Sequence, residues 1–255
     1  MSLLAVAAAC AVVAGAALQS SVGFGFALVA APLLFAAASP AEAIGLLIVL
    51  GLEIGLLTLL TERRRPEPVW RDAATVVAWS LPGALAGVAV LRSLDELALQ
   101  MLVTAGVVSA LVVNLRAARR TPPPPGAARE PPRWARPAAG LLAGALNTST
   151  STGGPPVVLL MMSRGLRPGV VRDTLTATFV GFAPVSAIAL LATSTSDAVP
   201  DPAALAALVP LTALGHVAGR PLFARLAAGR SYERVLTAVL LVAIAVGLLG
   251  VLLSG

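Results

Sequence analysis

The chain lacks most of the residues on which metal binding and redox chemistry depend. Its 255 residues include one cysteine (Cys10), one histidine (His216) and no lysine, and only 12% of them are charged. A single cysteine excludes an internal disulfide and a thiolate metal cluster, and a single histidine excludes sites built from several histidines. Nothing in the sequence resembles a nucleophile–base pair or a nucleotide-binding phosphate loop. We therefore expect no metal, no cofactor, no catalytic residue and no enzymatic activity.

Apolar sequence, in contrast, is abundant. Hydrophobic residues make up 58% of the chain and the mean hydropathy is +0.91, values that exclude a soluble globular protein. The predicted fold class is an all-α integral membrane protein, because several apolar stretches reach the ~20 residues that cross a lipid bilayer. The predicted crossings are residues 41–61, 73–91, 97–115, 171–193, 203–222 and 235–253. Residues 1–19 lack the basic start of a signal peptide, so we expect them in the mature protein.

The basic residues, all arginines, cluster between the apolar stretches. Residues 62–71, 116–136 and 219–234 hold four, six and four arginines, whereas 39–42 and 194–201 hold none. Cytoplasmic loops of membrane proteins carry an excess of basic residues. The pattern therefore predicts that the first three segments are cytoplasmic and that the last two, with both termini, are outside. It also argues against reading the net charge of +6 as a sign of a nucleic-acid partner.

Two segments carry the same polar interruption within apolar sequence. The first reads Gln19-Ser-Ser-Val-Gly-Phe-Gly25 and the second reads Asn147-Thr-Ser-Thr-Ser-Thr-Gly153. The register is gapless, since 147 − 19 and 153 − 25 both give 128. Irregular backbone at membrane depth is tolerated only where it is buried in protein or lines a cavity. Paired interruptions in two halves of a chain are the best sequence indication of a transporter's binding site.

The second interrupted segment, residues 137–163, has arginines on both flanks. A single crossing would place one flank outside, so we expect the segment to enter the membrane, break and return to the same face. Its apolar arms, 137–146 and 154–163, have ten residues each and reach about 15 Å, half of a ~30 Å hydrocarbon core. By the repeat, residues 3–38 should form a similar re-entrant hairpin from the opposite face.

Each half of the chain then consists of one hairpin and three crossings. An odd number of crossings turns the second half upside down relative to the first, which makes the halves inverted repeats. The predicted repeats are residues 1–120 and 137–255. The Pro- and Arg-rich segment 121–136 between them is predicted to be an extended cytoplasmic linker.

The two hairpin turns are predicted to meet near the middle of the bilayer and to bind an anion. Gly153 and Gly154 allow close approach to a ligand, and Pro155 suits the start of the next helix. A helix N-terminus attracts anions, but its dipole contributes only ~0.3–2 kcal/mol, so hydroxyl and N–H donors must supply most of the binding. The alternative is that these small residues only let helices pack closely. The predicted substrate-binding residues are Gln19, Ser20, Ser21, Gly23, Gly25, Asn147, Thr148, Ser149, Thr150, Gly153 and Gly154.

Two ionisable residues inside predicted crossings are candidates for proton coupling. Glu53 is the one acid deep within a predicted crossing, where an unpaired carboxylate costs at least ~2.5–3.5 kcal/mol. His216 lies deeper in its crossing than Arg220, which follows it on the same helix face. The alternatives are a protonated or hydrogen-bonded structural carboxyl for Glu53 and a helix-packing role for His216.

At these residues the chain resembles the sulfite exporter TauE/SafE family of bacterial permeases. The resemblance rests on Gly23-Phe24-Gly25 with Pro32, on Gly153-Gly154-Pro155 and on the two-half arrangement. It implies an integral protein of the bacterial plasma membrane that moves sulfite, organosulfonates or related sulfur oxyanions, usually outward and linked to proton movement. The chain departs from the common pattern at Phe26, where another glycine is usual, and at Leu46, where a small polar residue is frequent. Thr174 keeps that polar residue in the second half.

The sequence therefore predicts a secondary transporter for a small anion, with a sulfur oxyanion as the leading substrate. The alternatives are transport of another small anion or neutral metabolite, or the role of a membrane-embedded enzyme or accessory subunit. An enzyme should show intramembrane clusters of His, Asp and Glu, and an accessory subunit would not need duplicated polar interruptions. The exact substrate, the direction of transport, the coupling ion and the oligomeric state, a homo-oligomer included, stay open.

Overall fold

The computed structural model describes residues 3–61, 65–93, 130–192 and 199–227, and within these ranges every regular element is an α-helix. The predicted all-α class is therefore confirmed. The predicted crossings 97–115 and 235–253 and most of the linker lie outside the described residues. Five of the helices (α1, α3, α4, α8 and α9) are long and apolar enough to cross a membrane. The helices are α1 Leu3–Val22, α2 Phe26–Ala37, α3 Pro40–Thr61, α4 Trp70–Ser93, α6 Ala135–Thr150, α7 Gly154–Met162, α8 Pro168–Ala192 and α9 Pro202–Ala227.

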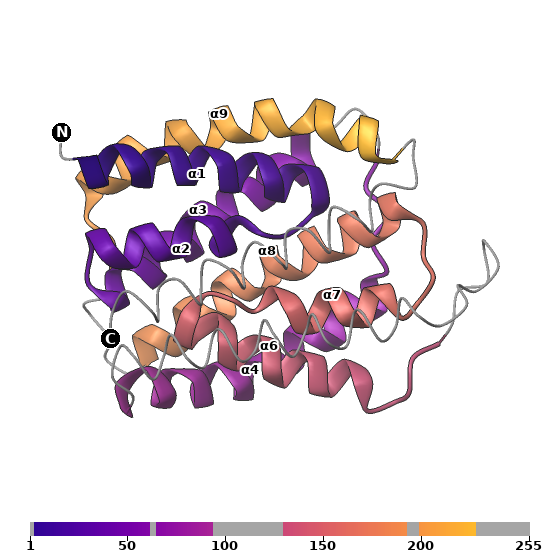
Figure 1. Ribbon diagram of the computed structural model, residues 1–255. Coiled ribbons are helices and arrows are strands. Elements are labelled where there is room, and N and C mark those ends of the chain that lie inside the picture. The colour runs from indigo at the N-terminus through magenta and orange to yellow at the C-terminus, as the bar shows by residue number, and fades with distance from the viewer. Residues whose placement is uncertain (1–2, 62–64, 94–129, 193–198, 228–255) are drawn as a thin grey trace, which may run out of the picture.

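Two helical hairpins enter the bundle from opposite ends. The α1–α2 hairpin opens at the end that carries the N-terminus, and the α6–α7 hairpin opens at the other end (Figure 1). Their arms are unequal, with 20 and 12 residues in the first and 16 and 9 in the second. The predicted ten-residue arm 137–146 is therefore shorter than the observed helix α6, because the polar residues after Leu146 continue the helix to Thr150.

Each hairpin packs its longer arm against a helix from the other half of the chain. Helix α1 lies against α9, and α6 lies against α4 (Figure 1). Glycines make both contacts close. A Cβ atom at Gly215 would lie 2.4 Å from the carbonyl oxygen of Val13, and one at Gly87 would lie 2.2 Å from that of Ala145. Small residues of this kind let helix backbones approach closely in membranes, where apolar burial against lipid gives little drive to association.

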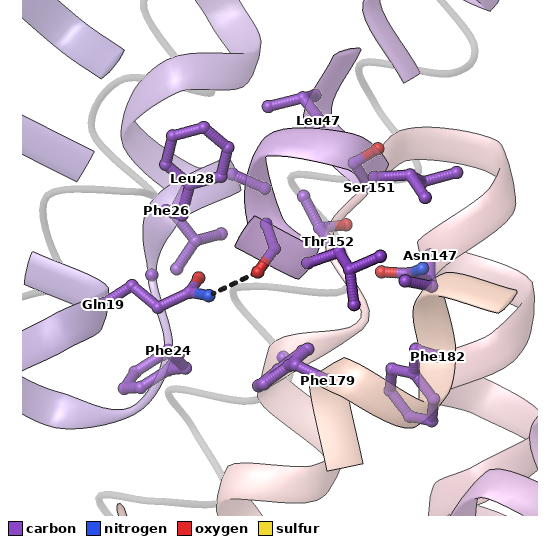
Figure 2. A pocket seen from close by; sticks show the side chains of 17 residues that line it. Gln19, Phe24, Phe26, Leu28, Leu47, Asn147, Ser151, Thr152, Phe179 and Phe182 are labelled. Atoms are coloured by element: carbon purple, nitrogen blue, oxygen red, sulfur yellow. Dashed lines mark hydrogen bonds between the residues drawn. The ribbon is translucent and has the colours of Figure 1, made fainter. Parts of the chain in front are cut away.

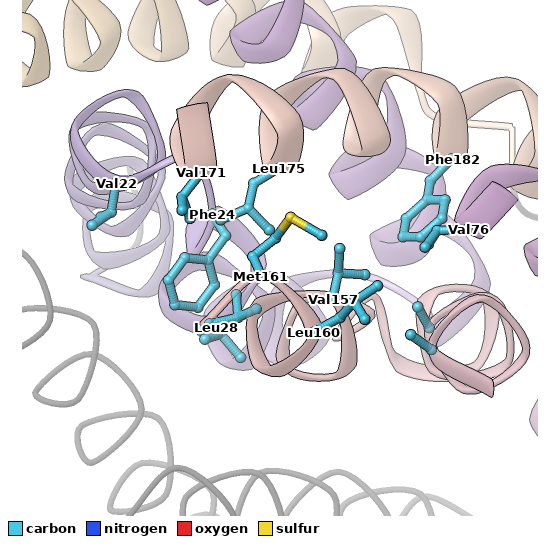
Figure 3. Close-up of a cluster of buried hydrophobic side chains, with 13 residues drawn as sticks. Val22, Phe24, Leu28, Val76, Val157, Leu160, Met161, Val171, Leu175 and Phe182 are labelled. Carbon is cyan, nitrogen blue, oxygen red and sulfur yellow. The ribbon is translucent and has the colours of Figure 1, made fainter. Parts of the chain in front are cut away.

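An apolar cluster lies where the first hairpin turn meets α7 and α8. Phe24 and Leu28 from the first hairpin lie beside Leu160 and Met161 of α7, and Leu175 of α8 completes this group (Figure 3). All five side chains are buried. The cluster therefore fixes the first turn against the second hairpin, and it decides where the polar residues of the two turns lie.

A buried ionic cluster attaches both ends of the second hairpin to α4. Asp72, at the start of α4, is fully buried and accepts hydrogen bonds from Arg136 at 2.6 Å and from Arg164, which follows α7. Glu130 accepts a hydrogen bond of 2.7 Å from Arg136, and this bond holds the pKa of Glu130 below its ordinary value. The buried Asp72 thus pairs with two buried arginines, and the exposed Glu130 supplies the second negative charge of the cluster.

The segment before α4 is held by α8. Asp173 accepts a hydrogen bond from the backbone N–H of Glu67 at 2.8 Å, and the hydroxyl of Thr174 accepts one from Val69 at 2.9 Å. Both acceptors are buried near the start of α8. The polar side chain of Thr174 therefore has a structural role at this end of the bundle.

Candidate functional site

A pocket of about 60 Å³ lies between the two hairpin turns. On this measure a water molecule needs roughly 10–15 Å³, so the pocket holds a few waters or one small polyatomic ion. Gln19 faces Asn147, Ser151 and Thr152 across it (Figure 2). The rings of Phe24, Phe179 and Phe182 lie along one side of the pocket (Figure 2). The lining residues are Gln19, Phe24, Gly25, Phe26, Ala27, Leu28, Leu47, Ile48, Gly51, Leu52, Asn147, Ser151, Thr152, Gly154, Phe179, Phe182 and Ala183.

The first turn is built on two glycines. Gly23 and Gly25 have φ angles of 90° and 108°, a region that side chains with a Cβ rarely adopt. Helix α2 begins directly afterwards, so the N–H groups of its first turn have no acceptor within the helix. Its first three residues, Phe26 to Leu28, line the pocket. Gln19 donates from Nε2 to the carbonyl of Gly51 at 3.4 Å, which directs its amide toward α3 (Figure 2).

The second turn contains a strained serine. Ser151 has a φ of 56°, the one positive φ of a residue other than glycine among the described residues. Its side chain lines the pocket, the residue is only 7% exposed, and its hydroxyl has no hydrogen-bond partner. A buried polar group left unpaired costs about 1–3 kcal/mol, and native proteins rarely keep one without a reason. Ser151 is therefore a candidate contact for a ligand atom.

Helix α7 offers fewer donors to an anion than the sequence reasoning assumed. Gly154 lines the pocket, but Pro155 and Pro156 follow it and have no N–H group. Two of the N–H groups that a helix N-terminus normally presents are therefore missing. Side chains of the second turn, with the N-terminus of α2, must provide most of the donors.

The structure brings some of the predicted site residues into the pocket and leaves others outside. Gln19, Gly25, Asn147 and Gly154 line it. Asn147 also donates from Nδ2 to the hydroxyl of Ser186 at 2.8 Å. Gly23 and Gly153 do not line the pocket. Gly23 packs on Arg172 instead, and Gly153 lies so close to α6 that a Cβ would be 2.6 Å from the carbonyl of Ala143.

The hydroxyls expected at the site are mostly bonded elsewhere. Ser21 donates to Gly219 O at 2.9 Å, Thr148 to Ala84 O at 2.8 Å and Ser149 to Ala145 O at 2.8 Å. Ser20 bonds to His216, and Thr150 is the last residue of α6. Because α6 continues through the polar run, the hydroxyls of Thr148 and Ser149 lie on a helix and donate to backbone carbonyls. The predicted site residues did not include Ser151, Thr152 or the four phenylalanines of the pocket, although Ser151 and Thr152 belong to the interrupted segment and its run of five hydroxyls.

His216 joins three helices away from the pocket lining. Its Nδ1 lies 2.8 Å from the hydroxyl of Ser20 on α1, and its Nε2 lies 3.1 Å from the hydroxyl of Thr61 on α3. Thr61 donates its own proton to the carbonyl of Leu57 at 2.6 Å, so it accepts one from Nε2. Nδ1 can then accept from Ser20, and a neutral imidazole satisfies both contacts.

Two charged residues lie close to the lining in different ways, since Glu53 follows the lining residue Leu52 and Arg172 contacts Ser20 of the first hairpin. Glu53 accepts a hydrogen bond from Thr212 of α9 and does not line the pocket. Arg172 is fully buried, donates from Nε to the carbonyl of Ser20 at 2.9 Å and lies 4.1 Å from the centre of the Phe223 ring. Its charge thus faces the C-terminal end of α1, where the helix dipole is negative. In the described ranges no three His, Cys, Asp or Glu side chains gather as a metal site would require.

The comparisons with known proteins give one match. The sequence model of the family described as sulfite exporter TauE/SafE matches residues 7–248, which is almost the whole chain. Comparisons with curated proteins and with solved structures gave no match. The family match confirms the resemblance seen at the glycine-rich turns and agrees with the several helices long enough to cross a membrane. The chain therefore belongs to the sulfite exporter TauE/SafE family, membrane transporters of sulfite- and sulfonate-type anions and not enzymes.

Proposed function

We propose that this protein is a secondary transporter of the bacterial plasma membrane that binds a small sulfur oxyanion between the two hairpin turns. The observation that carries this proposal is the buried, unpartnered hydroxyl of Ser151 in a pocket between two helix starts. An oxyanion there would accept the hydrogen bond that Ser151 lacks. It would also meet the amides of Gln19 and Asn147 from opposite sides.

The energetics require several donors rather than one strong charge. Removing a small anion from water costs far more than the ~0.3–2 kcal/mol that a helix dipole returns. Hydrogen bonds to a charged group contribute roughly 1.5–3 kcal/mol each. The two amides, the Ser151 hydroxyl and the first N–H groups of α2 are the donors available for this balance.

For the architecture we propose two inverted repeats, residues 1–120 and 137–255, joined by the linker 121–136, with the two hairpins as re-entrant elements. The opposite entry of the hairpins supports this (Figure 1). So does the reciprocal packing of α1 on α9 and of α6 on α4. The repeat register pairs these helices, because 215 − 87 is again 128, and Gly87 and Gly215 make the two closest contacts described above.

The distribution of arginines supports an orientation for this architecture. The segment before α4, the start of α6, the segment after α7 and the end of α9 lie at one end of the bundle (Figure 1). They include Arg65, Arg136, Arg164 and Arg225. We assign this end to the cytoplasm, because basic residues mark cytoplasmic loops. Export then requires the pocket to open alternately to the cytoplasmic end and to the opposite end of the bundle.

The test compares two serines of the second hairpin in proteoliposomes. Ser151→Ala removes the pocket hydroxyl, and we expect it to weaken sulfite and sulfonate binding by about 1–3 kcal/mol, or 5–150-fold. Ser163→Ala is the matched control, because Ser163 is exposed and its hydroxyl donates to Leu160 of its own helix. Equal transport by the parent and both variants would contradict the proposed site.

The alternative function is transport of another small anion or of a neutral metabolite. The phenylalanines of the pocket are compatible with this alternative, since apolar walls also suit less polar molecules. The same liposomes decide between the two functions. Labelled sulfite, methanesulfonate and an uncharged solute of similar size are offered separately, and uptake of the uncharged solute alone would replace the proposed function.

A further inference from the structure

The pocket contains no ionisable side chain among its described lining residues. Its polar side chains are two amides, Gln19 and Asn147, and two hydroxyls, Ser151 and Thr152. The remaining lining residues are apolar or glycine. Among these described residues an anion therefore meets dipoles and no basic side chain that would neutralise it directly.

The charged residues around the pocket are engaged with other groups. Arg172 donates to the carbonyl of Ser20 and stacks on Phe223, and its neighbour Asp173 accepts a hydrogen bond from the N–H of Glu67. Glu53 follows the lining residue Leu52 but bonds to Thr212. Asp173 carries the opposite charge to its neighbour Arg172, so it offsets part of the positive charge that Arg172 brings to the start of α8.

Such a site distinguishes anions by their charge. The free energy of removing an ion from water grows with the square of its charge, so a dianion costs about four times as much as a monoanion of the same size. The pocket can offer both ions the same amide, hydroxyl and N–H donors. With no basic partner in the described lining, the additional cost of the second charge is not compensated.

We propose that the pocket carries singly charged sulfur oxyanions, such as hydrogensulfite and alkanesulfonates, and rejects the dianions sulfite and sulfate. This inference rests on the proposed function and narrows its substrate class. Hydrogensulfite loses its proton near neutral pH, so both ionic forms are present under ordinary conditions. Each transported hydrogensulfite then carries a proton with it, and transport is linked to protons through the substrate itself.

The experiment measures uptake of sulfite and of methanesulfonate into proteoliposomes at a series of pH values. Methanesulfonate stays a monoanion throughout, so it reports any pH dependence that belongs to the protein, including that of Glu53 or His216. We expect the ratio of sulfite flux to methanesulfonate flux to follow the fraction of hydrogensulfite and to fall as the pH rises. A ratio that is constant or rises with pH would overturn the inference.

Competition by sulfate gives an independent measurement. We expect sulfate to inhibit methanesulfonate uptake at least about tenfold less effectively than unlabelled methanesulfonate does, a difference of about 1.4 kcal/mol in binding. Equal inhibition would overturn the inference and leave the proposed function standing. Absence of uptake for every anion would instead contradict the proposed function.

A substitution at Gln19 tests the physical reason. Gln19→Lys places a positive charge in the pocket at nearly constant length, and Gln19→Met is the uncharged control. We expect sulfate to become a competitor in the lysine variant and not in the methionine variant. Sulfate competition that appears in both variants would show that size, and not charge, sets the selectivity.

Discussion

Thr212 has one hydroxyl proton and two acceptors within reach. Its oxygen lies 2.7 Å from the carbonyl of Val209 and is hydrogen-bonded to the carboxyl of Glu53. If the proton goes to Val209, the carboxyl must supply its own proton to bond Thr212, and if it goes to Glu53, the carboxylate can be ionised. The two protonation states of Glu53 thus correspond to two hydrogen-bond arrangements between α3 and α9. This is the physical basis on which we propose Glu53 as a coupling residue.

For Glu53 we predict that Gln will separate exchange from coupled transport. The Gln side chain resembles the permanently protonated carboxyl, so Glu53→Gln should keep exchange of methanesulfonate across the membrane. Accumulation driven by a pH gradient should be lost, and Glu53→Asp should restore part of it because the shorter side chain is still ionisable. Both fluxes are measured in the same liposome preparations. Methanesulfonate is the required substrate, since hydrogensulfite carries its own proton.

The opposite result assigns Glu53 a different role. Gradient-driven accumulation in the Gln variant equal to that of the parent would make Glu53 a structural residue. The next candidate is then His216, whose ring joins Ser20 beside the first turn to Thr61 at the end of α3.

At the level of elements, the hairpins depend on close contacts between glycines and backbone carbonyls. Gly87 of α4 meets Ala145 and Thr148 of α6, and Gly215 of α9 meets Val13 of α1. The ionic cluster at Asp72 adds a second attachment for the α6–α7 hairpin. We infer that the second hairpin moves together with α4 when the pocket changes its access.

The close contact at Gly87 gives a prediction for stability. In Gly87→Ala the new Cβ would lie 2.2 Å from Ala145 O and from Thr148 Oγ1, so α4 and α6 must separate. We expect a loss of about 1–3 kcal/mol, the usual cost of overfilling a packed interface. The measurement is the thermal unfolding midpoint of the purified protein in detergent.

The control for this prediction is another helical glycine with free space. A Cβ at Gly51 would meet its nearest neighbour, a ring carbon of Phe26, only at 4.0 Å. Gly51→Ala should therefore leave the midpoint unchanged or raise it, because alanine is favoured over glycine in helices by up to ~1 kcal/mol. Equal destabilisation by both substitutions would mean that steric contact at α4 and α6 is not the cause.

At the level of the whole molecule, orientation in the membrane follows from where the arginines lie. We predict that Arg133→Cys, before α6, is labelled by an impermeant thiol reagent only after cells are permeabilised. Asp201→Cys, before α9, should be labelled on intact cells. Both positions are exposed, and both variants are made in a Cys10→Ser background, since Cys10 is exposed as well. Labelling of position 133 on intact cells would overturn the assigned orientation and the inverted repeat that depends on it.

The sequence by itself determined the class of the protein and pointed to the two turns between which we propose the site. Composition predicted an all-α membrane protein, and the duplicated interruptions at Gln19–Gly25 and Asn147–Gly153 pointed to the two turns that line the pocket. These features are local, because hydropathy, proline and glycine act on the chain within a few residues. The TauE/SafE resemblance depended on the same residues and was confirmed over residues 7–248.

Only the tertiary structure decided which polar groups of the turns face the pocket. The sequence offers five consecutive hydroxyls from Thr148 to Thr152, and nothing local distinguishes them. Helix α6 continues to Thr150 because it packs against α4, where the carbonyl of Ala84 accepts a hydrogen bond from the hydroxyl of Thr148 and Gly87 allows a close approach. Ser151 then takes the left-handed conformation that ends the helix, and its hydroxyl alone of the described hydroxyls is left buried and unpaired. Contacts between residues far apart in the chain therefore determine which hydroxyl faces the pocket, and a local sequence pattern carries no information about such contacts.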